Sequence, residues 1–343
     1  ARVWYQSADR NLPSSMLIQQ PDENEKQLDE SIRTIINYDG YSGMAEYFLT
    51  GSFSVSRLDY SNKMASIDSR NLSEMIIFKA GLVNMPGKFV RTKVTIDNEN
   101  TLVKSENYND NKAGRNVASV TASAEVIGSG RLGATFLLRE IIHNNSFLVP
   151  DFSTGLQLRI TDTGDYYFKA NYSRNTKLPS MNDLFWDPGG NPSLVNESAN
   201  MFEFIYEMNQ KISSTLLLKF DLSLYLNSIK NMIQWRPGEY SYWIADNVKN
   251  VNTSGLESLL SFSYNLNKIS STLNLSYTYS RATTTGSDII NDESIGKQLI
   301  YVPQNQANAT FRFSYMNIYT YWISGFTGRR YTTVDNSNFL PGY

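Results

Sequence analysis

The sequence predicts an all-β protein, part of an antiparallel up-and-down transmembrane β-barrel. Three observations lead to this fold class. Apolar and polar residues alternate with a period of two along most of the 343 residues, helical spacing is never sustained, and short turn-rich links alternate with long polar ones. The alternation gives each strand one face for an apolar medium and one for a polar medium, as a barrel in a membrane requires.

The alternation is clearest in residues 218–227. There Leu218, Phe220, Leu222, Leu224 and Leu226 alternate with Lys219, Asp221, Ser223, Tyr225 and Asn227. The same period recurs in residues 168–173, 273–280 and 307–315. We expect the apolar set, which includes Phe311 and Phe313, to face lipid, and the polar set, which includes Asn308 and Arg312, to face the lumen.

The connections between the predicted strands fall into two classes by length. Short links lie at 39–43, 84–88, 128–131, 162–165, 211–214, 267–270 and near 317, and long polar loops at 8–27, 60–71, 98–115, 175–199, 236–247, 282–302 and 331–341. Counting on this basis gives about fifteen strands, with tight turns at one end and long loops at the other. This asymmetry is typical of outer-membrane barrels, whose periplasmic turns are short and extracellular loops long.

Composition excludes several classes of function. A net charge of −2 provides no basic surface for nucleic acid, and the absence of cysteine removes thiolate chemistry and Cys-based metal sites. His143 is the only histidine, so no multi-histidine metal centre is available. Glu203 and Glu207 share the polar face of one predicted strand, which suits a water-filled lumen better than an acid–base pair. We therefore predict no enzyme activity, no catalytic residues and no cofactor.

Five acidic residues in the long loops could in principle bind a hard cation. They are Asp183, Asp187, Asp246, Asp288 and Asp292. Their spacing matches no calcium-binding loop, so we expect solvated loop acids and no metal site.

One segment resembles a known family. Residues 171–197 read NYSRNTKLPSMNDLFWDPGGNPSLVNE. This is similar to the barrel motif of TonB-dependent outer-membrane receptors, in which a strand ending in Ser-Arg leads through Pro and an Asn-Asp-Leu-aromatic run to Gly-Asn-Pro and an acidic residue. Residues 227–235, 247–257, 301–308, 326–331 and 340–343 also look like strands of this family, in its cobalamin and siderophore type from gut Bacteroidetes. Residues 1–165 fit mainly by their strand-and-loop rhythm and by Trp4-Tyr5-Gln6.

The resemblance implies that residues 1–343 are an internal piece of a barrel of about 22 strands. The family's plug domain, its coupling box and the closing C-terminal strands are not found in the sequence. The expected function is active transport across the outer membrane of a scarce nutrient complex of the siderophore, cobalamin or haem class, with energy from the TonB system.

The partners implied are the nutrient complex, outer-membrane lipid, the TonB coupling protein acting through the absent N-terminal region, and a candidate surface lipoprotein. The alternatives are a passive porin or structural barrel and, more remotely, a soluble carbohydrate-binding sheet protein. The sequence upstream of the chain discriminates between them, because a plug domain indicates a receptor and a signal peptide leading directly into strands indicates a porin.

Aromatic residues in the long loops are the candidate ligand contacts. They are Trp186, Tyr240, Tyr242 and Trp243, with Asp187 to provide polar orientation. Flat aromatic side chains can stack on a corrin, a catechol or a sugar at small entropic cost. The alternative for these residues is an aromatic girdle or packing of the loop against itself. The Pro-Gly-Gly-Asn-Pro run at 188–192 predicts rigid turns that place the next strand.

Overall fold

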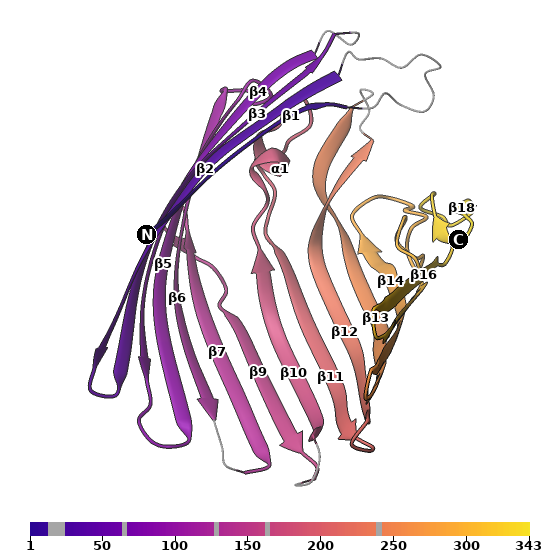
Figure 1. Cartoon of the computed structure of the whole chain (residues 1–343). Coiled ribbons are helices and arrows are strands. Elements are labelled where there is room, and N and C mark those ends of the chain that lie inside the picture. The colour runs from indigo at the N-terminus through magenta and orange to yellow at the C-terminus, as the bar shows by residue number, and fades with distance from the viewer. Residues whose placement is uncertain (13–24, 64–66, 127–129, 162–164, 238–241) are drawn as a thin grey trace.

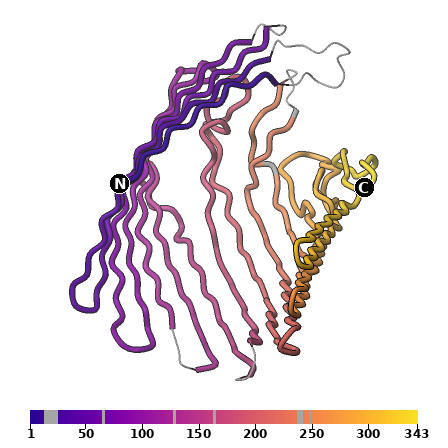
Figure 2. Tube along the Cα trace, viewed as in Figure 1, coloured from indigo at the N-terminus to yellow at the C-terminus, as the bar shows by residue number. Residues whose placement is uncertain are grey.

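The computed structural model describes residues 1–12, 25–63, 67–126, 130–161, 165–237 and 242–343. Fifteen strands follow one another in a single antiparallel sheet, each paired with its neighbours in sequence (Figures 1 and 2). They are β1 (Arg2–Asn11), β2 (Glu25–Ser42), β3 (Ala45–Asn62), β4 (Ile67–Asn84), β5 (Val90–Ser105), β6 (Lys112–Val126), β7 (Leu132–His143), β9 (Asp151–Arg159), β10 (Asp165–Lys177), β11 (Glu197–Lys211), β12 (Leu216–Pro237), β13 (Trp243–Leu266), β14 (Ile269–Ser287), β15 (Asn305–Tyr315) and β16 (Ile318–Thr327).

Three short strands and one helix complete the described elements. The strand β8 (Ser146–Phe147) pairs with β7, and β17 (Arg330–Tyr331) pairs with β18 (Phe339–Leu340). The helix α1 (Met181–Phe185) is 5 residues long. Within the described ranges, no helical segment has the length and apolar character that crossing a membrane would require. The predicted fold class, the up-and-down order and the strand number are confirmed.

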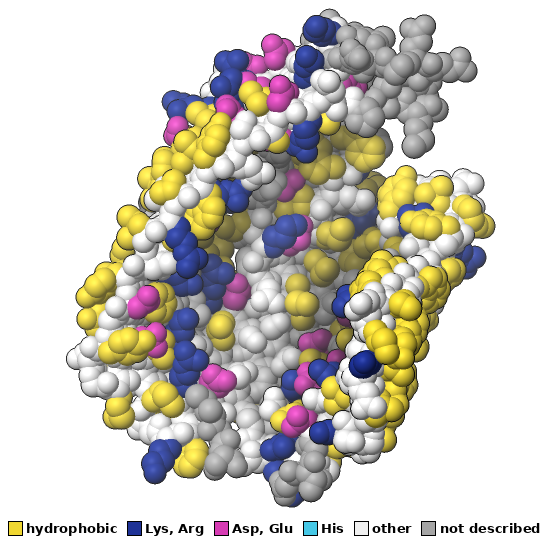
Figure 3. All heavy atoms as spheres, in the orientation of Figure 1, with side chains coloured by type: hydrophobic (Ala, Val, Ile, Leu, Met, Phe, Trp, Pro, Cys, Tyr) yellow, Lys and Arg dark blue, Asp and Glu magenta, His cyan; other side chains and the backbone are white. Residues whose placement is uncertain are grey.

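The sheet curves around a hollow and thus has a concave inner face and a convex outer face (Figures 1 and 2). Charged side chains gather in the hollow, while apolar side chains cover the outer surface along both visible sides (Figure 3). The alternation seen in the sequence therefore separates two media across the sheet.

Contacts within each face agree with the predicted orientation. On the outer face, Phe168 packs against Phe204 and Tyr206 with ring centroids 5.6 and 5.1 Å apart. On the inner face, the Lys169 ammonium lies 2.6 Å from a Glu207 carboxylate oxygen. Leu226, on the same outer face, keeps 60% of its surface exposed. Such exposure of a large apolar side chain is expected where lipid, not water, is the solvent.

The two ends of the sheet differ as predicted. At one end the turns are tight, and Gly43, Asn267 and Met316 adopt positive φ angles of 62°, 52° and 53° in two-residue links. The opposite end carries the longer connections, and α1 lies there (Figure 1). We call these the turn end and the loop end.

Several strands extend farther toward the loop end than the sequence predicted. The loops expected at 60–71 and 98–115 are shorter, because β3 runs to Asn62, β4 begins at Ile67, β5 runs to Ser105 and β6 begins at Lys112. Apart from Ile67, Leu102, Val103 and Ala113, the residues of these extensions are polar. Backbone pairing maintains the strand there after the apolar alternation has ended, so a prediction from hydrophobic period stops too early.

Candidate functional site

A pocket on the inner face lies against the wall formed by β10 to β14. Its volume is about 570 Å³. Its polar lining includes Asn171, Glu203, Tyr225, Asn227 and Glu257. The register places Asn171, Glu203 and Tyr225 side by side on three adjacent strands. The pocket is therefore built by strand register rather than by a local sequence motif.

Hydrogen bonds orient the polar wall of this pocket. Ser223 donates its hydroxyl to Glu203 Oε1 over 2.6 Å, and Asn171 Nδ2 donates to Glu203 Oε2 over 3.3 Å. Asn227 Nδ2 donates to Thr253 Oγ1 over 2.9 Å. Glu203 is thus held by neighbours on both sides, whereas Glu257, Tyr225 and the amide oxygens of Asn171 and Asn227 can present polar groups to a ligand.

Gly255 makes room for Tyr225. The two residues are direct partners across β12 and β13. A Cβ atom at position 255 would collide with the Tyr225 hydroxyl and with the Tyr279 carbonyl oxygen. Glycine at this position lets the tyrosine ring lie close to the sheet.

The segment 288–304 folds inward and adds Leu299 and Val302 to the pocket. Its backbone joins β14, because the Leu299 amide donates to the Ala282 carbonyl over 2.8 Å. Gln298, only 5% exposed, accepts from the Ala282 amide at its side-chain oxygen over 2.9 Å. Leu299 and Val302 thus form an apolar cover on one side of the pocket, whose other lining residues are mostly polar.

A buried ion pair holds the same segment from β13. Lys249 Nζ lies 2.9 Å from Ser294 Oγ and 4.0 Å from Asp292 Oδ2, and the two charged side chains are 6% and 7% exposed. Burial alone would raise the pKa of Asp292. Hydrogen bonds from Ser287 and Ser294 and the charge of Lys249 outweigh this effect and lower that pKa.

At the loop end, the segment 178–196 is fixed by a capped helix. Ser180 and Asp183 form a capping box around the first turn of α1. Asp183 also accepts a hydrogen bond from the Trp235 indole N–H of β12 over 2.8 Å. Tyr108 donates its hydroxyl to Asn182 Oδ1 over 2.7 Å, which joins α1 to the β5–β6 loop.

A small hydrophobic cluster lies beneath this segment. Tyr108, Ala113 and Met181 are its buried members, and Phe185 and Trp186 pack against it. Burial raises the pKa of Tyr108. The loop end of the sheet therefore has a packed core of its own, which holds residues 181–186 in one position.

The structure places the five predicted site residues in different settings. Trp186 is half-buried in the hydrophobic cluster, and its backbone forms a β-bridge with Tyr108. Asp187 is exposed, with its amide donating to the Asn107 carbonyl over 2.7 Å. Trp243 begins β13 with 58% of its surface exposed, and Tyr242 beside it is half-buried. Tyr240 lies outside the described residues.

The Pro-Gly-Gly-Asn-Pro run at 188–192 brings the segment after Trp186 against the start of β13 at Trp243. Gly189 has a φ of 115°, and its carbonyl accepts from the Ala245 amide over 2.8 Å. A Cβ atom at this position would collide with the Trp243 carbonyl oxygen. The segment after Trp186 therefore lies directly against the start of β13, in agreement with the predicted turn function of this run.

The expectation that all five loop acids are solvated is wrong for two of them. Asp183 accepts the Trp235 indole N–H, and Asp292 is buried beside Lys249. Asp246 pairs with Arg236 over 2.8 Å but keeps 37% of its side chain exposed. Asp187 and Asp288 are exposed. Within the described ranges, no group of three or more His, Asp or Glu side chains is arranged to hold a metal ion.

Sequence reasoning missed part of the pocket. Alternation predicts that Tyr225 and Asn227 lie on the polar face, but it does not identify them as ligand-facing. Glu257, Leu299 and Val302 carry no motif. The parity of β13 could have placed Glu257 on the inner face, whereas the inward path of residues 288–304 has no signal in the sequence.

Comparisons with known proteins agree with this architecture. The model of a protein family described as "TonB dependent receptor-like, beta-barrel" matches residues 30–343. The vitamin B12 transporter BtuB of Vibrio vulnificus is 34% identical over 104 residues, which are 30% of this chain and 16% of the transporter. BtuB of Photobacterium profundum is 31% identical over 100 residues, 28% of this chain and 16% of the transporter.

Solved structures of similar fold include two siderophore receptors. PirA from Acinetobacter baumannii has a TM-score of 0.70 at 12% identity, with 94% of this chain and 56% of that chain covered. PirA from Pseudomonas aeruginosa has a TM-score of 0.67 at 14% identity, with 90% and 59% covered. At these identities the likeness shows the fold alone. The chain spans less than two thirds of the length of each of these four proteins.

Proposed function

Because the chain belongs to the family of TonB-dependent receptor-like β-barrels, we propose that it forms part of a receptor that binds a scarce nutrient complex and imports it with energy from the TonB system. The family consists of outer-membrane transport receptors rather than enzymes, and the outer membrane is the location of this protein. The energy source, the ligand and the partners belong to the proposal.

The observation that carries the proposal is the pocket on the inner face. A nutrient complex that enters at the loop end meets a wall with one aromatic ring, Tyr225, and several hydrogen-bonding groups, Asn171, Asn227 and Glu257 among them. A few convergent polar groups beside an apolar cover are typical of small-molecule sites. A passive pore has no need for a cover such as Leu299 and Val302.

Cobalamin is the ligand that we propose first among the candidates. The local identity to two vitamin B12 transporters supports this class, whereas the siderophore receptors support only the fold. A corrin ring offers a flat face for Tyr225 and amide side groups for Asn227 and Asn171. Ferric siderophores and haem are the other members of the ligand class to test.

The loop end supplies the first contacts in this proposal. Trp243 is the most accessible of the described aromatic candidates, and Tyr242 precedes it directly. Tyr240 and Asp187 complete the set, while Trp186 acts by holding the loop against the hydrophobic cluster. The TonB coupling protein would act through a plug domain encoded upstream, and a surface lipoprotein would approach from the loop end.

The test of this function is ligand uptake by cells that express the full receptor. Labelled cobalamin, a ferric siderophore and haem are supplied separately at nanomolar concentration, with and without the gene for the coupling protein. We expect uptake of one of the three ligands and its loss when the coupling protein is absent. Equal uptake in both strains, rising linearly with concentration, would instead identify a passive porin.

A further inference from the structure

The pocket on the inner face contains two carboxylates and no cation. The described residues that line it include Glu203 and Glu257, whereas none of them is Lys, Arg or His. Glu203 is half-buried and Glu257 is exposed. Within the described ranges, neither carboxylate forms an ion pair. The pocket therefore has a net negative charge, since carboxylates in contact with water are ionised at neutral pH.

Other hollows of the inner face differ in this respect. The one formed by β6, β7, β9 and β10 is lined by both Glu125 and Lys169. The one formed by β1 to β5 is lined by both Asp29 and Arg33. Each of these hollows presents both signs of charge. The absence of a cation thus distinguishes the pocket on β10 to β14 from the other two.

The cations on the neighbouring parts of the inner face do not neutralise the pocket. On β10 and β13 the inward cations already pair with other carboxylates. These pairs are Lys169 with Glu207 at 2.6 Å, Lys177 with Glu197 at 3.1 Å and Lys249 with Asp292 at 4.0 Å. On β12, Lys219 is three inward positions from Tyr225, about 20 Å toward the turn end. Lys297 on the covering segment is exposed but does not line the pocket.

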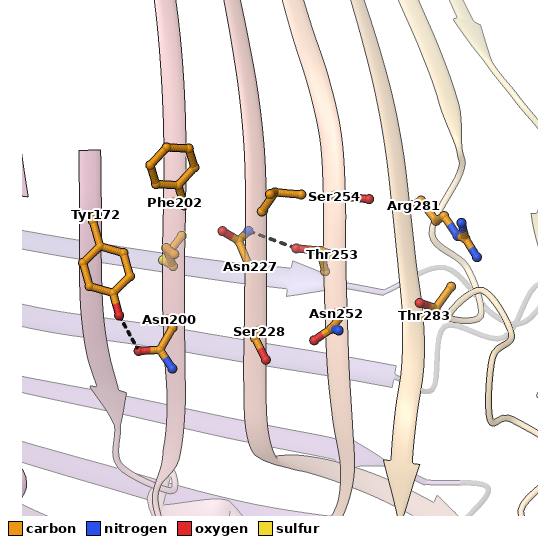
Figure 4. A pocket seen from close by; sticks show the side chains of 12 residues that line it. Tyr172, Asn200, Phe202, Asn227, Ser228, Asn252, Thr253, Ser254, Arg281 and Thr283 are labelled. Atoms are coloured by element: carbon orange, nitrogen blue, oxygen red, sulfur yellow. Dashed lines mark hydrogen bonds between the residues drawn. The ribbon is translucent and has the colours of Figure 1, made fainter. Parts of the chain in front are cut away.

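Arg281 on β14 is separated from the pocket by the sheet. It belongs to the row of Phe202 and Leu226, which lies on the outer face. Asn227 and Thr253, which do line the pocket, are joined by the hydrogen bond drawn between them in Figure 4, and Arg281 appears beside them on the next strand. The positive charge of Arg281 is therefore on the opposite face from the two carboxylates.

Strand register places the two carboxylates on either side of β12. Glu203 pairs with Tyr225 across β11 and β12, and Glu257 pairs with Ser223 across β12 and β13. Two strand spacings of about 4.8 Å and one inward step of about 6.8 Å put the Cα atoms of Glu203 and Glu257 about 12 Å apart. A flat ligand of about this width that packs on the Tyr225 ring therefore reaches both negative charges.

Two negative charges without a counter-charge bias the pocket against anions. Unit charges about 4 Å apart in water change an affinity by a factor of about five, and a low-dielectric wall increases the factor. A ferric tris-catecholate siderophore carries several negative charges at its surface, and haem carries propionates. Amide N–H, hydroxyl and ammonium groups are favoured instead, because a carboxylate accepts their hydrogen bonds.

Building on the receptor function proposed above, we propose that Glu203 and Glu257 select the nutrient complex by charge. The pocket accepts an uncharged or cationic complex rich in hydrogen-bond donors and rejects multiply charged anions. Glu257 accepts hydrogen bonds from the ligand, while Glu203, held by Ser223 and Asn171, contributes its charge. The ligand class therefore narrows to corrinoids with amide side groups and to ferric hydroxamates with a free ammonium group, and excludes tris-catecholates and haem.

The test uses the full-length receptor, purified in mild detergent, and two pairs of probes that differ in charge. One pair is cobalamin and the derivative in which one side-chain amide of cobalamin has been hydrolysed to a carboxylate. The other pair is a ferric trihydroxamate with a free ammonium group and a ferric tris-catecholate. Equilibrium dialysis near neutral pH gives the dissociation constant of each probe.

Three double variants separate charge from structure. Glu203→Gln/Glu257→Gln removes both charges and keeps a hydrogen-bond-accepting oxygen at each position. Glu203→Asp/Glu257→Asp retains the charges. The matched control is Glu46→Gln/Glu125→Gln, which removes two inner-face carboxylates near the turn end. Heat-modifiable migration on a gel confirms that all variants are folded.

We expect the parent, the control and the Asp variant to bind the uncharged or cationic member of at least one pair about tenfold or more tightly than the anionic member. The Gln variant should reduce this ratio to about two, and about half-molar salt should reduce it in the parent. A ratio near one in the parent, an unchanged ratio in Glu203→Gln/Glu257→Gln, or no binding of any probe would overturn the proposal.

Uptake by cells with and without the coupling protein separates this result from the receptor function. The expected charge preference, together with uptake that does not need the coupling protein, would contradict the receptor function and support the selection by charge. Uptake that needs the coupling protein, together with tighter binding of the anionic member, would overturn the selection by charge and leave the receptor function intact.

Discussion

Trp235 donates its indole N–H to Asp183 over 2.8 Å and thereby joins β12 to the first turn of α1. The other oxygen of the same carboxylate accepts the Ser180 amide over 2.8 Å. One side chain therefore both caps the helix and attaches it to the sheet. This carboxylate acts together with the Tyr108–Asn182 hydrogen bond and the hydrophobic cluster to hold the segment 178–196 at the loop end.

This relationship predicts unequal effects of two substitutions. Asp183→Ala removes the cap and the indole contact together and should lower the local stability of α1 by about 2 kcal/mol. Trp235→Phe removes only the indole contact and should cost about 1 kcal/mol. Hydrogen exchange of the amides of residues 183–191 in the full receptor measures both values. Equal protection in the two variants would show that the cap contributes nothing.

The buried pair of Lys249 and Asp292 predicts a pH dependence for the segment 288–304. Because the pKa of Asp292 is lowered in the folded state, its contribution to stability is present above the unfolded value of about 4 and is lost as pH falls through the folded value. Exchange protection of the Gly296 and Leu299 amides should therefore stay constant from about pH 8 to 5 and fall below about pH 4. Asp292→Asn should remove that step, and a step of unchanged size in this variant would assign it to another group.

The two faces of β12 predict opposite tolerance of a charge. Leu222→Arg places a guanidinium in lipid and should impair insertion by about 2 to 4 kcal/mol near the midplane. Ser223→Arg places the same group on the inner face and should be accepted. The fraction of folded receptor in the outer membrane measures both. Equal amounts of the two variants would contradict the assignment of faces.

The aromatic residues at the start of β13 are expected to contact the ligand first. Replacing Tyr240, Tyr242 and Trp243 together by alanine should reduce ligand affinity by about tenfold at matched surface abundance, because stacking area is lost. Trp186→Ala should instead loosen the loop, since Trp186 packs against the hydrophobic cluster. Uptake and affinity equal to the parent in the triple variant would remove this segment from the binding site.

The face of the sheet on which a strand residue lies can be predicted from the sequence, because side-chain direction follows a fixed period of two. Leu222 and Ser223 can therefore be assigned to opposite faces from the sequence alone. Strand ends such as Ser105 cannot, since backbone pairing continues after the regular alternation of apolar and polar residues has ended. The packing of Trp186 against Tyr108 depends on contacts between residues far apart in the chain, for which alternation carries no information. The same applies to the inward fold of Leu299 over the pocket.

The measurement that tests the account most directly is the dissociation constant of the full-length receptor for the ligand that the uptake assay identifies. Tyr225→Ala/Asn227→Ala removes the ring and an amide from the pocket on the inner face. Leu222→Ala/Leu224→Ala changes neighbouring positions on the outer face of the same strand. We predict a dissociation constant about tenfold higher for the first variant and unchanged for the second. A constant equal to the parent for Tyr225→Ala/Asn227→Ala would contradict the claim that this pocket contacts the ligand.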